Sequence, residues 1–536
     1  MKLLTAEQMR RIDQVTLERT GLSNRDLMEN AGRQVAEFLL RLFSPPGRIT
    51  VLCGKGNNGG DALVAARTLL QRGHPPRVAL LALPGDLKGD ARANYHAYLQ
   101  AGGTVESIPD EAAWENNRAA LLDCEVVVDG LLGTGLSGPA KGLFLRVIRD
   151  VNRARPRCRV LAVDIPSGLP SDTGEPAAEA IQADATLTFT APKRAQVFPP
   201  NCARVGTLAV APIGTPEELY AGDPELFLNL TVARQFAKLP LGRELTAHKG
   251  SFGHVLHVSG SRGKTGAAVL GGKAALRMGA GLVTVATAAS GLPLVASMVP
   301  EIMTEPLAET DSGAISSRAL DYGRFAKLVE GKTVLSMGPG LTTHPETVQF
   351  VHTVVKQFDL PLVLDADALN ALVGRLDLLR SRRSRLVVLT PHPGEMARLL
   401  GTSSAEVQRQ RVEVAQRFAR DYGVFVILKG YRTLVAAPEG QVFVNPTGNP
   451  GMATGGAGDV LAGMVAATLA QWGQAAPAEA LCLAVFLHGW AGDRAAAAQG
   501  EQGLIASDIT EALPRAWAAL RDKIERDDPG SYYVIP

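Results

Sequence analysis

The sequence predicts an α/β protein of two domains, each built on a largely parallel sheet. Short β-rich runs alternate with helical stretches along most of the chain, and this alternation is typical of a parallel sheet covered on both faces. The length of 536 residues accommodates about two to four domains at roughly 150 residues each. The alternation stops in the Pro- and Gly-interrupted stretch 213–230 and then restarts, which places the linker there.

The first domain is expected over residues 1–220. Its first forty residues carry apolar side chains at helical spacing, and an interruption at 21–24 divides them into two helices. A doubly wound sheet follows. Its expected strands are 49–53, 77–83, 125–130, 159–164, 185–190 and 207–214.

The second domain is expected over residues 225–536. A hairpin over 433–445 and an apolar helix over 459–471 follow its strands. The polar closing segment ERDDPGSYYVIP (525–536) is expected to be loose. The expected strands are 254–260, 282–287, 333–340, 361–367, 385–391 and 424–430.

Composition excludes several classes of protein. The net charge of +2, from 55 Lys+Arg and 53 Asp+Glu, gives no basic footprint for a nucleic acid or an anionic membrane. No apolar run approaches the roughly 18 residues of a transmembrane helix, and the start MKLLTAEQMRRIDQ lacks the features of a signal peptide. The 5 cysteines are scattered, as reduced thiols are. We therefore expect a cytoplasmic protein without nucleic-acid or membrane partners.

The loop GKGNNGGD (54–61) follows the first strand and opens a helix. Its glycines satisfy the G-x-G-x-x-G dinucleotide fingerprint, but no acidic residue stands about 20 positions later to hold a ribose hydroxyl. A glycine-rich turn at a helix N-terminus still presents N–H groups and a positive dipole to an anion. The side-chain carbonyls of Asn57 and Asn58 add hard oxygen ligands for a cation. A tight turn with an asparagine cap is the structural alternative.

Two more strands end on an aspartate that precedes a glycine-bearing loop. Asp129 ends one strand before LLGTGLSGP, and Asp164 ends another before Pro166, Ser167 and Gly168. The carboxyl ends of strands in a doubly wound sheet face the ligand crevice, so these loops converge with 54–61. A single strand-end aspartate is often only a helix cap, whereas two beside a loop rich in backbone donors predict a site.

These motifs carry a specific resemblance. GKGNNGGD, VDGLLGTGLSGP (128–139) and VDIPSGL (163–169), in this order and after MENAGR (28–33), resemble the epimerase domain of the NAD(P)H-hydrate repair proteins. The resemblance implies a Rossmann-like domain that acts on hydrated nicotinamide nucleotides. It implies potassium ligands at Asn58, Asp129 and Ser167. The implied substrate contacts are Asn57, Asn58, Gly59, Gly60, Asp61, Gly133, Thr134, Gly135, Leu136, Ser137, Gly138, Pro139 and Asp164.

The chemistry of that substrate fits these residue types. It carries a hydroxyl on the carbon next to the ring nitrogen, so the nitrogen lone pair assists cleavage of the C–O bond. A carboxyl group that shuttles the proton lets the oxygen return on the other face and invert the centre. Asp164 is the predicted catalytic shuttle.

The segment NPTGNPGMATGGAGDVLAGMVAA (445–467) is the strongest motif of the second domain. Gly455, Gly456 and Gly458 precede Asp459 at the start of an apolar helix. Their N–H groups would form an oxyanion cradle for a transferring phosphoryl group, and Asp459 would take the proton of an attacking hydroxyl. An Asp-capped helix after a flexible loop is the alternative. The arrangement resembles the G-A-G-D signature of ribokinase-like kinases, whereas the earlier GKT (263–265) lacks the spacing of a P-loop.

Further segments narrow the resemblance to the ADP- or ATP-dependent NAD(P)H-hydrate dehydratases. They are GSRGKTGAA (260–268), SMGPGL (336–341), VLDADALN (363–370), TPHPGEMARLLG (390–401) and VILKGYRTLV (426–435). The implied contacts to the hydrated nucleotide are Ala268, Gly340, His392 and the catalytic Asp459. The implied contacts to the adenine nucleotide are Lys429, Gly430, Tyr431, Arg432, Thr433 and Gly458. The spelling KGYRT follows the fused bacterial type, which uses ADP.

Nucleotide chemistry implies magnesium. Asp365 and Asp367 either contribute oxygens to it or serve as structural acids at a strand end. His488 lies in an apolar helical run and is interpreted as a core residue.

We therefore predict a bifunctional repair enzyme. It epimerises the R and S hydrates of NADH or NADPH and then dehydrates the S hydrate with ADP, releasing AMP and phosphate. Phosphorylation turns the poor leaving group hydroxide into a good one, which explains kinase machinery in a lyase. The resemblance also implies a homo-oligomer, a tetramer or higher, in which the N-terminal helices form an interface or pack on their own sheet.

Two other functions compete with this prediction. A ribokinase-like kinase that releases a phosphorylated alcohol explains the second motif but not the first. A non-catalytic, RNA-associated module explains neither the joint presence of Asn58, Asp129, Asp164 and Ser167 nor the balanced charge.

Overall fold

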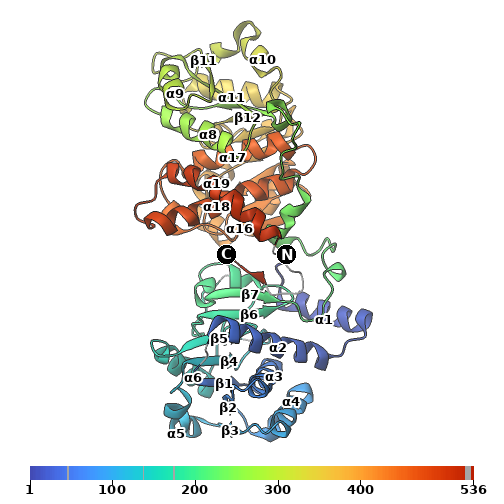
Figure 1. The fold of residues 1–536 in the computed structure, drawn as a ribbon. Helices are drawn as coiled ribbons and strands as arrows, with labels where there is room; N and C mark the ends of the chain where they lie inside the picture. The colour runs from blue at the N-terminus through green and yellow to red at the C-terminus, as the bar shows by residue number, and fades with distance from the viewer. Residues whose placement is uncertain (45–46, 137, 173–174, 526–532, 536) are drawn as a thin grey trace. The chain divides into compact units, whose positions relative to one another are not determined.

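The computed structural model describes residues 1–44, 47–136, 138–172, 175–525 and 533–535 (Figure 1). The chain forms two compact units, one made of Met1–Leu226 with the end of the chain and one that begins at Phe227. The expected domains 1–220 and 225–536 differ from these units at the C-terminus, because the last residues join the first unit.

The described ranges of the first unit form an eight-stranded sheet in the order β18-β7-β6-β5-β4-β1-β2-β3 (Figure 1). Strand β18 is antiparallel to β7, and the other neighbours are parallel. Because β1 lies between β2 and β4, the strand order reverses there, and such a switch point opens a crevice at the carboxyl ends of the strands. The strands are β1 (Ile49–Cys53), β2 (Arg77–Leu80), β3 (Val105–Ser107), β4 (Val126–Gly130), β5 (Arg159–Val163), β6 (Ala185–Phe189), β7 (Thr207–Ala211) and β18 (Tyr533–Val534).

Successive side chains of each strand point to opposite faces of this sheet. Both faces carry apolar side chains, and helices cover both. Val51 packs in a core with α2, α3 and α4, whereas its neighbour Leu52 packs in a core with α5 and α6. This confirms the predicted doubly wound α/β domain. The helices are α1 (Ala6–Thr20), α2 (Asn24–Leu42), α3 (Asn57–Gln71), α4 (Gly89–Gln100), α5 (Glu111–Leu121), α6 (Gly142–Ala154) and α7 (Arg194–Val197).

The two N-terminal helices lie where the sequence predicts them. Thr5 and Ser23 cap their N-termini, and Gly21, with φ of 74°, ends α1. Helix α2 buries Leu27 and Val35 in the core of its own sheet.

The end of the chain differs from the expectation. A loose tail is wrong for Tyr533–Val534, which pairs with β7, and the Ile535 N–H donates to the Leu208 carbonyl at 2.9 Å. Tyr533 and Ile535 are both buried, and burial of these apolar side chains explains why a terminal segment is ordered.

The described ranges of the second unit form a ten-stranded sheet in the order β11-β10-β9-β12-β13-β14-β15-β16-β17-β8. The strands from β11 to β15 are parallel, the predicted hairpin β16–β17 is antiparallel, and β8, inside the expected linker, adds a parallel edge strand. The strands are β8 (Leu228–Leu230), β9 (His254–Val258), β10 (Leu282–Ala288), β11 (Met303–Leu307), β12 (Val334–Met337), β13 (Leu362–Leu364), β14 (Val387–Leu389), β15 (Phe425–Leu428), β16 (Leu434–Ala436) and β17 (Val442–Val444).

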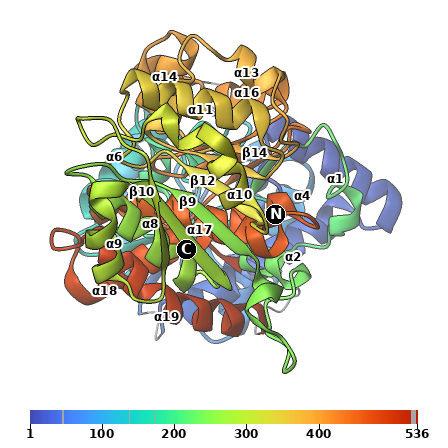
Figure 2. The same cartoon turned by 90° about the horizontal axis from the view of Figure 1, so that it is seen from above.

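The helices of the second unit surround one large core that includes α8, α17, α18 and α19. Helix α8 packs against β10 and against α9, which lies next to it in Figure 2. No described helix combines the length and the apolarity that crossing a bilayer needs. The helices are α8 (Thr265–Arg277), α9 (Leu292–Met298), α10 (Arg324–Val329), α11 (Pro345–Gln357), α12 (Asp367–Ala371), α13 (Asp377–Arg380), α14 (Pro393–Leu400), α15 (Ser404–Arg409), α16 (Arg411–Tyr422), α17 (Ala457–Trp472), α18 (Pro477–Gln499) and α19 (Ala506–Glu525).

Candidate active sites

The first candidate site lies where β1, β4 and β5 end, at the switch point of the first sheet. The loop 54–61 connects β1 to α3, Asp129 is the next-to-last residue of β4, and Asp164 directly follows β5. The register pairs Leu52 with Asp129 and Asp129 with Ala162, so the three strand ends are level. The structure therefore brings the three predicted loops together.

Close backbone approach explains the glycines of the first loop. A Cβ at Gly54 would lie 1.9 Å from the Leu131 carbonyl oxygen, and one at Gly59 would lie 1.9 Å from the Gly54 carbonyl oxygen. Gly56 is the N-cap of α3, and within the described ranges this cap forms no side-chain hydrogen bond. The asparagine-capped turn is therefore wrong. The first N–H groups of α3 retain the donor capacity that an anion site needs.

The three predicted potassium ligands lie close together, with Ser167 bound to the buried Asp129 and sharing the Leu132 carbonyl oxygen with Asn58. Ser167 donates its N–H to Asp129 Oδ2 at 2.8 Å and its hydroxyl to Oδ1 at 2.5 Å. Asn58 Nδ2 donates to the Leu132 carbonyl oxygen at 3.2 Å, and the Ser167 hydroxyl lies 3.2 Å from the same oxygen. Burial raises the pKa of Asp129 to about 6, although the Ser167 hydrogen bonds limit the rise.

Asp164 forms an ion pair with a lysine that sequence reasoning missed. Lys193 Nζ lies 2.5 Å from Asp164 Oδ1, and the Thr188 hydroxyl donates to the same oxygen at 2.8 Å. Gln196 Nε2 donates to the Asp164 carbonyl oxygen at 2.6 Å. The φ of Asp164 is 61°, a left-handed conformation that is uncommon outside glycine and often marks functional positions.

Two more carboxyl groups surround this pair. Burial raises the pKa of Asp13, on α1, to about 6, with the charge of Lys193 opposing the rise and that of Asp164 adding to it. Burial also raises the pKa of Asp61 well above its usual range, with the charges of Asp164 and Asp13 adding. Asp13 Oδ1 is buried and has no hydrogen-bond partner among the described residues. One ammonium thus serves three carboxyl groups.

A sequence signal existed for only one of the missed residues. Lys193 follows β6, the parallel neighbour of β5, so the strand-end argument extends to it. Asp13 comes from a helix that precedes the sheet in the chain, and strand ends give no indication of it.

The remaining predicted substrate residues form the loop after β4. Most of Gly133, Thr134, Gly135, Leu136, Gly138 and Pro139 are partly or fully exposed, so the loop is open to a ligand. Ser137 lies outside the described residues. Their role in substrate contact stays a prediction.

The second candidate site lies at the carboxyl ends of β13, β14 and β15. Lys429 follows β15, and its ammonium lies 2.7 Å from Asp365 Oδ1 and 3.8 Å from Glu395 Oε2. Thr390, after β14, donates its hydroxyl to Asp365 at 2.7 Å. Burial alone would lower the pKa of Lys429, but the charges of Asp365 and Glu395 raise it above its ordinary value.

Asp459 lies beside this ion pair in the first turn of α17. A Cβ at Gly458 would lie 3.4 Å from Lys429 Nζ, which places the start of α17 next to the ammonium. Burial raises the pKa of Asp459 to about 6, with the charge of Asp365 adding and that of Lys429 opposing. Gly456, with φ of 91°, is the N-cap of α17. The alternative of an Asp-capped helix is therefore wrong.

The predicted magnesium acids occupy different positions. Asp365 binds Lys429, as described above. Asp367 begins α12 and accepts the Thr342 N–H at 2.8 Å, with Lys264 Nζ 3.9 Å away. The carboxyl groups of Asp365 and Asp367, two positions apart, both lie close enough to Asp459 for their charges to raise its pKa.

The predicted histidines both support helix ends. His392 Nδ1 accepts the Gly394 N–H at 3.0 Å as the N-cap of α14, and its half-exposed ring stays open to a ligand. His488 Nε2 lies 2.9 Å from the Ala457 carbonyl oxygen at the start of α17, and burial lowers its pKa to about 4. The neutral, buried His488 agrees with its interpretation as a core residue.

The loop Lys429–Thr433 has a strained conformation. Arg432 has φ of 56° and donates to the Pro446 carbonyl oxygen, and the Thr433 hydroxyl donates to the Gly430 carbonyl oxygen at 2.9 Å. The Tyr431 side chain is 49% exposed, which leaves its ring open to a ligand.

The two other predicted contacts both lie earlier in the chain than this loop. Gly340 follows β12 with φ of 69°, and a Cβ there would lie 3.0 Å from the Lys264 carbonyl oxygen. Ala268 is fully buried in α8, so its contact with a ligand stays a prediction.

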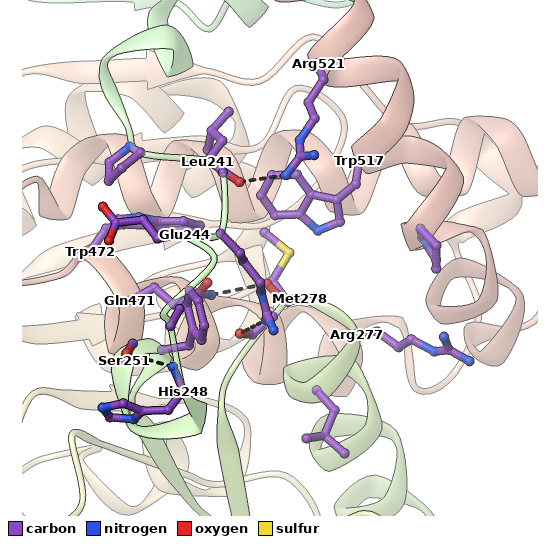
Figure 3. A pocket seen from close by; sticks show the side chains of 18 of the residues that line it. Leu241, Glu244, His248, Ser251, Arg277, Met278, Gln471, Trp472, Trp517 and Arg521 are labelled. Atoms are coloured by element: carbon purple, nitrogen blue, oxygen red, sulfur yellow. Dashed lines mark hydrogen bonds between the residues drawn. The ribbon is translucent and has the colours of Figure 1, made fainter.

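A separate pocket of about 640 Å³ opens at the other end of α17 (Figure 3). Trp472, Trp517, His248 and Arg521 are among the side chains that line it, and the Arg521 guanidinium donates to the Leu241 carbonyl oxygen at 2.8 Å. None of the predicted site residues that the structure describes lines this pocket. It lies about 20 Å along α17 from Asp459, at 1.5 Å per residue.

Comparisons with known proteins match both halves of the chain. A family model described as YjeF-related protein N-terminus matches residues 24–195, and one described as NAD(P)H-hydrate dehydratase matches residues 255–515. The chain is 44% identical over 530 residues to a bifunctional NAD(P)H-hydrate repair enzyme of Moorella thermoacetica, covering 98% of each chain. It is 39% identical over 525 residues to the enzyme of that name from Thermofilum pendens, again covering 98% of each.

A solved structure matches the second half alone. It is an ADP/ATP-dependent NAD(P)H-hydrate dehydratase from Bacillus subtilis, co-crystallised with ATP and Mg²⁺. The identity is 31%, the match covers 55% of this chain and 98% of that chain, and the TM-score is 0.47.

Proposed function

The chain belongs to the family of bifunctional NAD(P)H-hydrate repair enzymes, and from this premise we propose that its two sites act in succession on one damaged cofactor. The first unit interconverts the R and S hydrates of NADH or NADPH. The second, ribokinase-like unit dehydrates the S hydrate with ADP and releases AMP and phosphate. The observation that carries the proposal is that one chain holds both a carboxylate paired with a buried lysine, Asp164 with Lys193, and a glycine-rich helix start that presents Asp459.

In the epimerase site the reacting carbon lies at Asp164. The Asp164 carboxyl group gives a proton to the departing hydroxyl, which leaves as water, and the resulting carboxylate takes a proton from the returning water, while Lys193 holds the carboxylate in place from one side. The N-terminus of α3 and the loop 133–139 bind the anionic part of the nucleotide. Because the carbon passes through a planar, ring-stabilised state, oxygen can return to either face.

We propose potassium as the cation of this unit. Asn58, Asp129 and Ser167 offer an amide, a carboxylate and a hydroxyl, and the Leu132 carbonyl adds a backbone oxygen. This all-oxygen set holds a single carboxylate, and no described cluster of three or more His, Cys, Asp or Glu side chains is placed to hold a metal. Such a weakly charged set fits a monovalent cation better than a divalent one. A bound potassium would offset negative charge near the phosphates of the substrate.

In the dehydratase site Asp459 accepts the proton of the ring hydroxyl as its oxygen attacks the β-phosphoryl group of ADP. The N–H groups of 455–458 stabilise the transferring oxygens. The phosphate then leaves with the C–O electrons, assisted by the ring nitrogen lone pair, and loss of a proton from the neighbouring ring carbon restores the nicotinamide double bond. The loop Lys429–Thr433 holds the adenine nucleotide. Ala268, Gly340 and His392 contact the hydrated ring.

Magnesium accompanies the nucleotide in this proposal. The carboxylates of Asp365 and Asp367 lie at the same sheet edge as Asp459 and offer the hard oxygen donors that magnesium prefers. When bound, the ion would neutralise charge on the phosphate chain.

We also propose a cytoplasmic homo-oligomer, a tetramer or higher.

The test mixes the protein with both hydrate epimers of NADH and follows the absorbance of the reduced nicotinamide with ADP, with ATP and with neither. Complete recovery that depends on ADP and releases one phosphate per NADH is expected. Asp164→Asn should stop recovery at the initial S fraction, and Asp459→Asn should abolish recovery but leave the epimers exchanging. A stable phosphorylated product without NADH would instead identify a kinase, and no recovery with either nucleotide would contradict the proposal.

A further inference from the structure

One buried cation beside the nucleotide loop is not used by the reaction described above. Arg411 begins α16 and is 8% exposed. Its Nη1 donates to the Tyr431 carbonyl oxygen at 2.5 Å, in the middle of the loop Lys429–Thr433. Its Nε and Nη2 are buried and have no hydrogen-bond partner within the part of the chain that the structure describes.

This arrangement is costly in the absence of a ligand. A buried guanidinium without a counter-ion pays its full desolvation penalty, and each unpaired buried donor adds to it. A cation at the first position of a helix also meets the positive end of the helix dipole. Burial lowers the pKa of Arg411 to about 10, and no described carboxylate raises it again.

The neighbouring lysine shows the contrast. Lys429, at the start of the same loop, lies within ion-pair distance of both Asp365 and Glu395. Its charge is therefore balanced inside the protein. The charge of Arg411 is balanced by no described side chain, although it lies at the same loop.

The Arg411 guanidinium lies against the backbone of the loop Lys429–Thr433. A Cβ at Gly430 would lie 3.6 Å from Arg411 Nη2, so the guanidinium lies next to the glycine backbone of the loop as well as to the Tyr431 carbonyl. The neighbouring Arg432 holds φ of 56°, a conformation that needs support from its surroundings. The bond from Arg411 to the Tyr431 carbonyl supplies such support.

We propose that Arg411 is a positioning residue of the adenine-nucleotide site, which fixes the loop through the Tyr431 carbonyl and supplies positive charge that the phosphate groups of the bound nucleotide balance. This inference rests on the proposed use of ADP by the second unit. It adds a residue from α16 to a site otherwise formed by strand-end loops and α17.

The experiment measures the binding of ADP, AMP and adenosine to the full chain by titration calorimetry. The variants are Arg411→Met, which removes the charge, and Arg411→Lys, which keeps it. Arg382→Met is the matched control: Arg382 is another partly buried arginine whose pKa is lowered by burial, and it donates to the Tyr422 carbonyl oxygen at 2.8 Å, at the opposite end of α16.

We expect Arg411→Met to weaken ADP binding roughly tenfold, AMP binding less, and adenosine binding least, because a charge acts on phosphates and not on the nucleoside. Arg411→Lys should recover most of the ADP affinity, and Arg382→Met should change none of the three. Thermal unfolding with and without ADP checks the fold: the ADP-induced rise of the melting temperature should shrink in Arg411→Met and persist in the control.

Equal weakening of all three ligands would overturn the inference, because it would show a loop-shaping role without charge. Unchanged ADP affinity, or a lower melting temperature of the free Arg411→Met protein with an undiminished ADP-induced rise, would overturn it too. If the wild-type chain binds none of the three ligands, the proposed nucleotide use fails first and this inference with it. Binding by the wild type with equal losses in the variant refutes the inference alone.

Discussion

Replacing Lys193 by methionine should disable one site of the chain and leave the other active. The Lys193 side chain is 1% exposed, and its ammonium lies 2.5 Å from Asp164 and 2.7 Å from the Thr188 hydroxyl. Removal of one partner from a buried ion pair costs about 3–5 kcal/mol, because the other charge stays buried without a counter-ion. Asp164 is 16% exposed and retains the Thr188 hydroxyl. We therefore expect the free energy of unfolding of the first unit to fall by about 3 kcal/mol, the lower end of that range.

The rate of epimerisation should also fall in this variant, and by a larger factor than the loss of stability alone would cause. Lys193 positions Asp164, the proposed proton shuttle, and loss of such acid–base assistance typically slows a reaction by about 10²–10⁴-fold. The assay supplies both NADH-hydrate epimers with excess ADP and records absorbance. The variant should recover the S fraction at the wild-type rate and the R fraction only slowly. Urea unfolding reports the stability change. Recovery of the R fraction at the wild-type rate by a folded variant would refute the role of the ion pair.

Three further outcomes follow from the structure. The pKa of Asp13 is about 6 in the folded chain, above its ordinary value of 3.8, so ionisation of this group destabilises the fold as the pH rises from about 4 to 6. Asp13→Asn should therefore raise the free energy of unfolding by about 2 kcal/mol at pH 8 and by less at pH 5. Urea titrations at both pH values measure this difference. If Asp459, whose pKa is about 6, is the base that we propose, the dehydration rate should fall tenfold per pH unit below that value, and a flat profile from pH 5 to 8 would exclude it as the base. A Cβ at Gly463 would lie 2.0 Å from the Gly271 carbonyl oxygen, so Gly463→Ala should separate α17 from α8, cost about 1–3 kcal/mol in urea unfolding, and slow dehydration without affecting epimerisation.

Much of the fold could be predicted because strand and helix patterns in this chain agree with tertiary structure. Continuous apolar runs such as 49–53 are buried on both faces, and their flanking glycine loops mark the strand ends. Short edge strands escaped prediction. Val105–Ser107 is only partly buried, so its sequence carries little apolar signal. Tyr533–Val534 is stabilised by a partner more than 300 positions earlier in the chain, β7 at Thr207–Ala211, and local sequence carries no information about such pairing.

The residues of the candidate sites differ in the same way, because some have a local sequence signal and others do not. Asp129, Asp164 and Asp459 lie at strand ends or helix starts, where sequence alone indicates exposure to a crevice. Asp13 and Arg411 reach the sites from helices whose local sequence is ordinary. Their importance comes from burial without a full set of partners, which only the assembled structure reveals.

Both sites place more carboxyl groups than lysines in a buried cluster, and burial, together with the charges of neighbouring carboxyl groups, raises the pKa values of Asp13, Asp61 and Asp459. Lys193 faces Asp13, Asp61 and Asp164, and Lys429 faces Asp365, Glu395 and Asp459. One ammonium offsets only part of this rise, so each cluster includes a carboxyl group that keeps its proton to a higher pH than a free aspartate does.

A cluster in that state can both accept a proton and return it. The epimerase step needs this property, because the oxygen must leave and come back at the same site. The dehydratase step needs only a base, and there the excess negative charge must also be balanced before a phosphate chain can approach. The uncompensated charge of Arg411, on the nucleotide side, is suited to that second requirement. An excess of carboxyl groups over lysines thus allows proton transfer in both directions in the first unit. In the second unit the same excess makes binding of the phosphate groups depend on cations outside the cluster, such as Arg411.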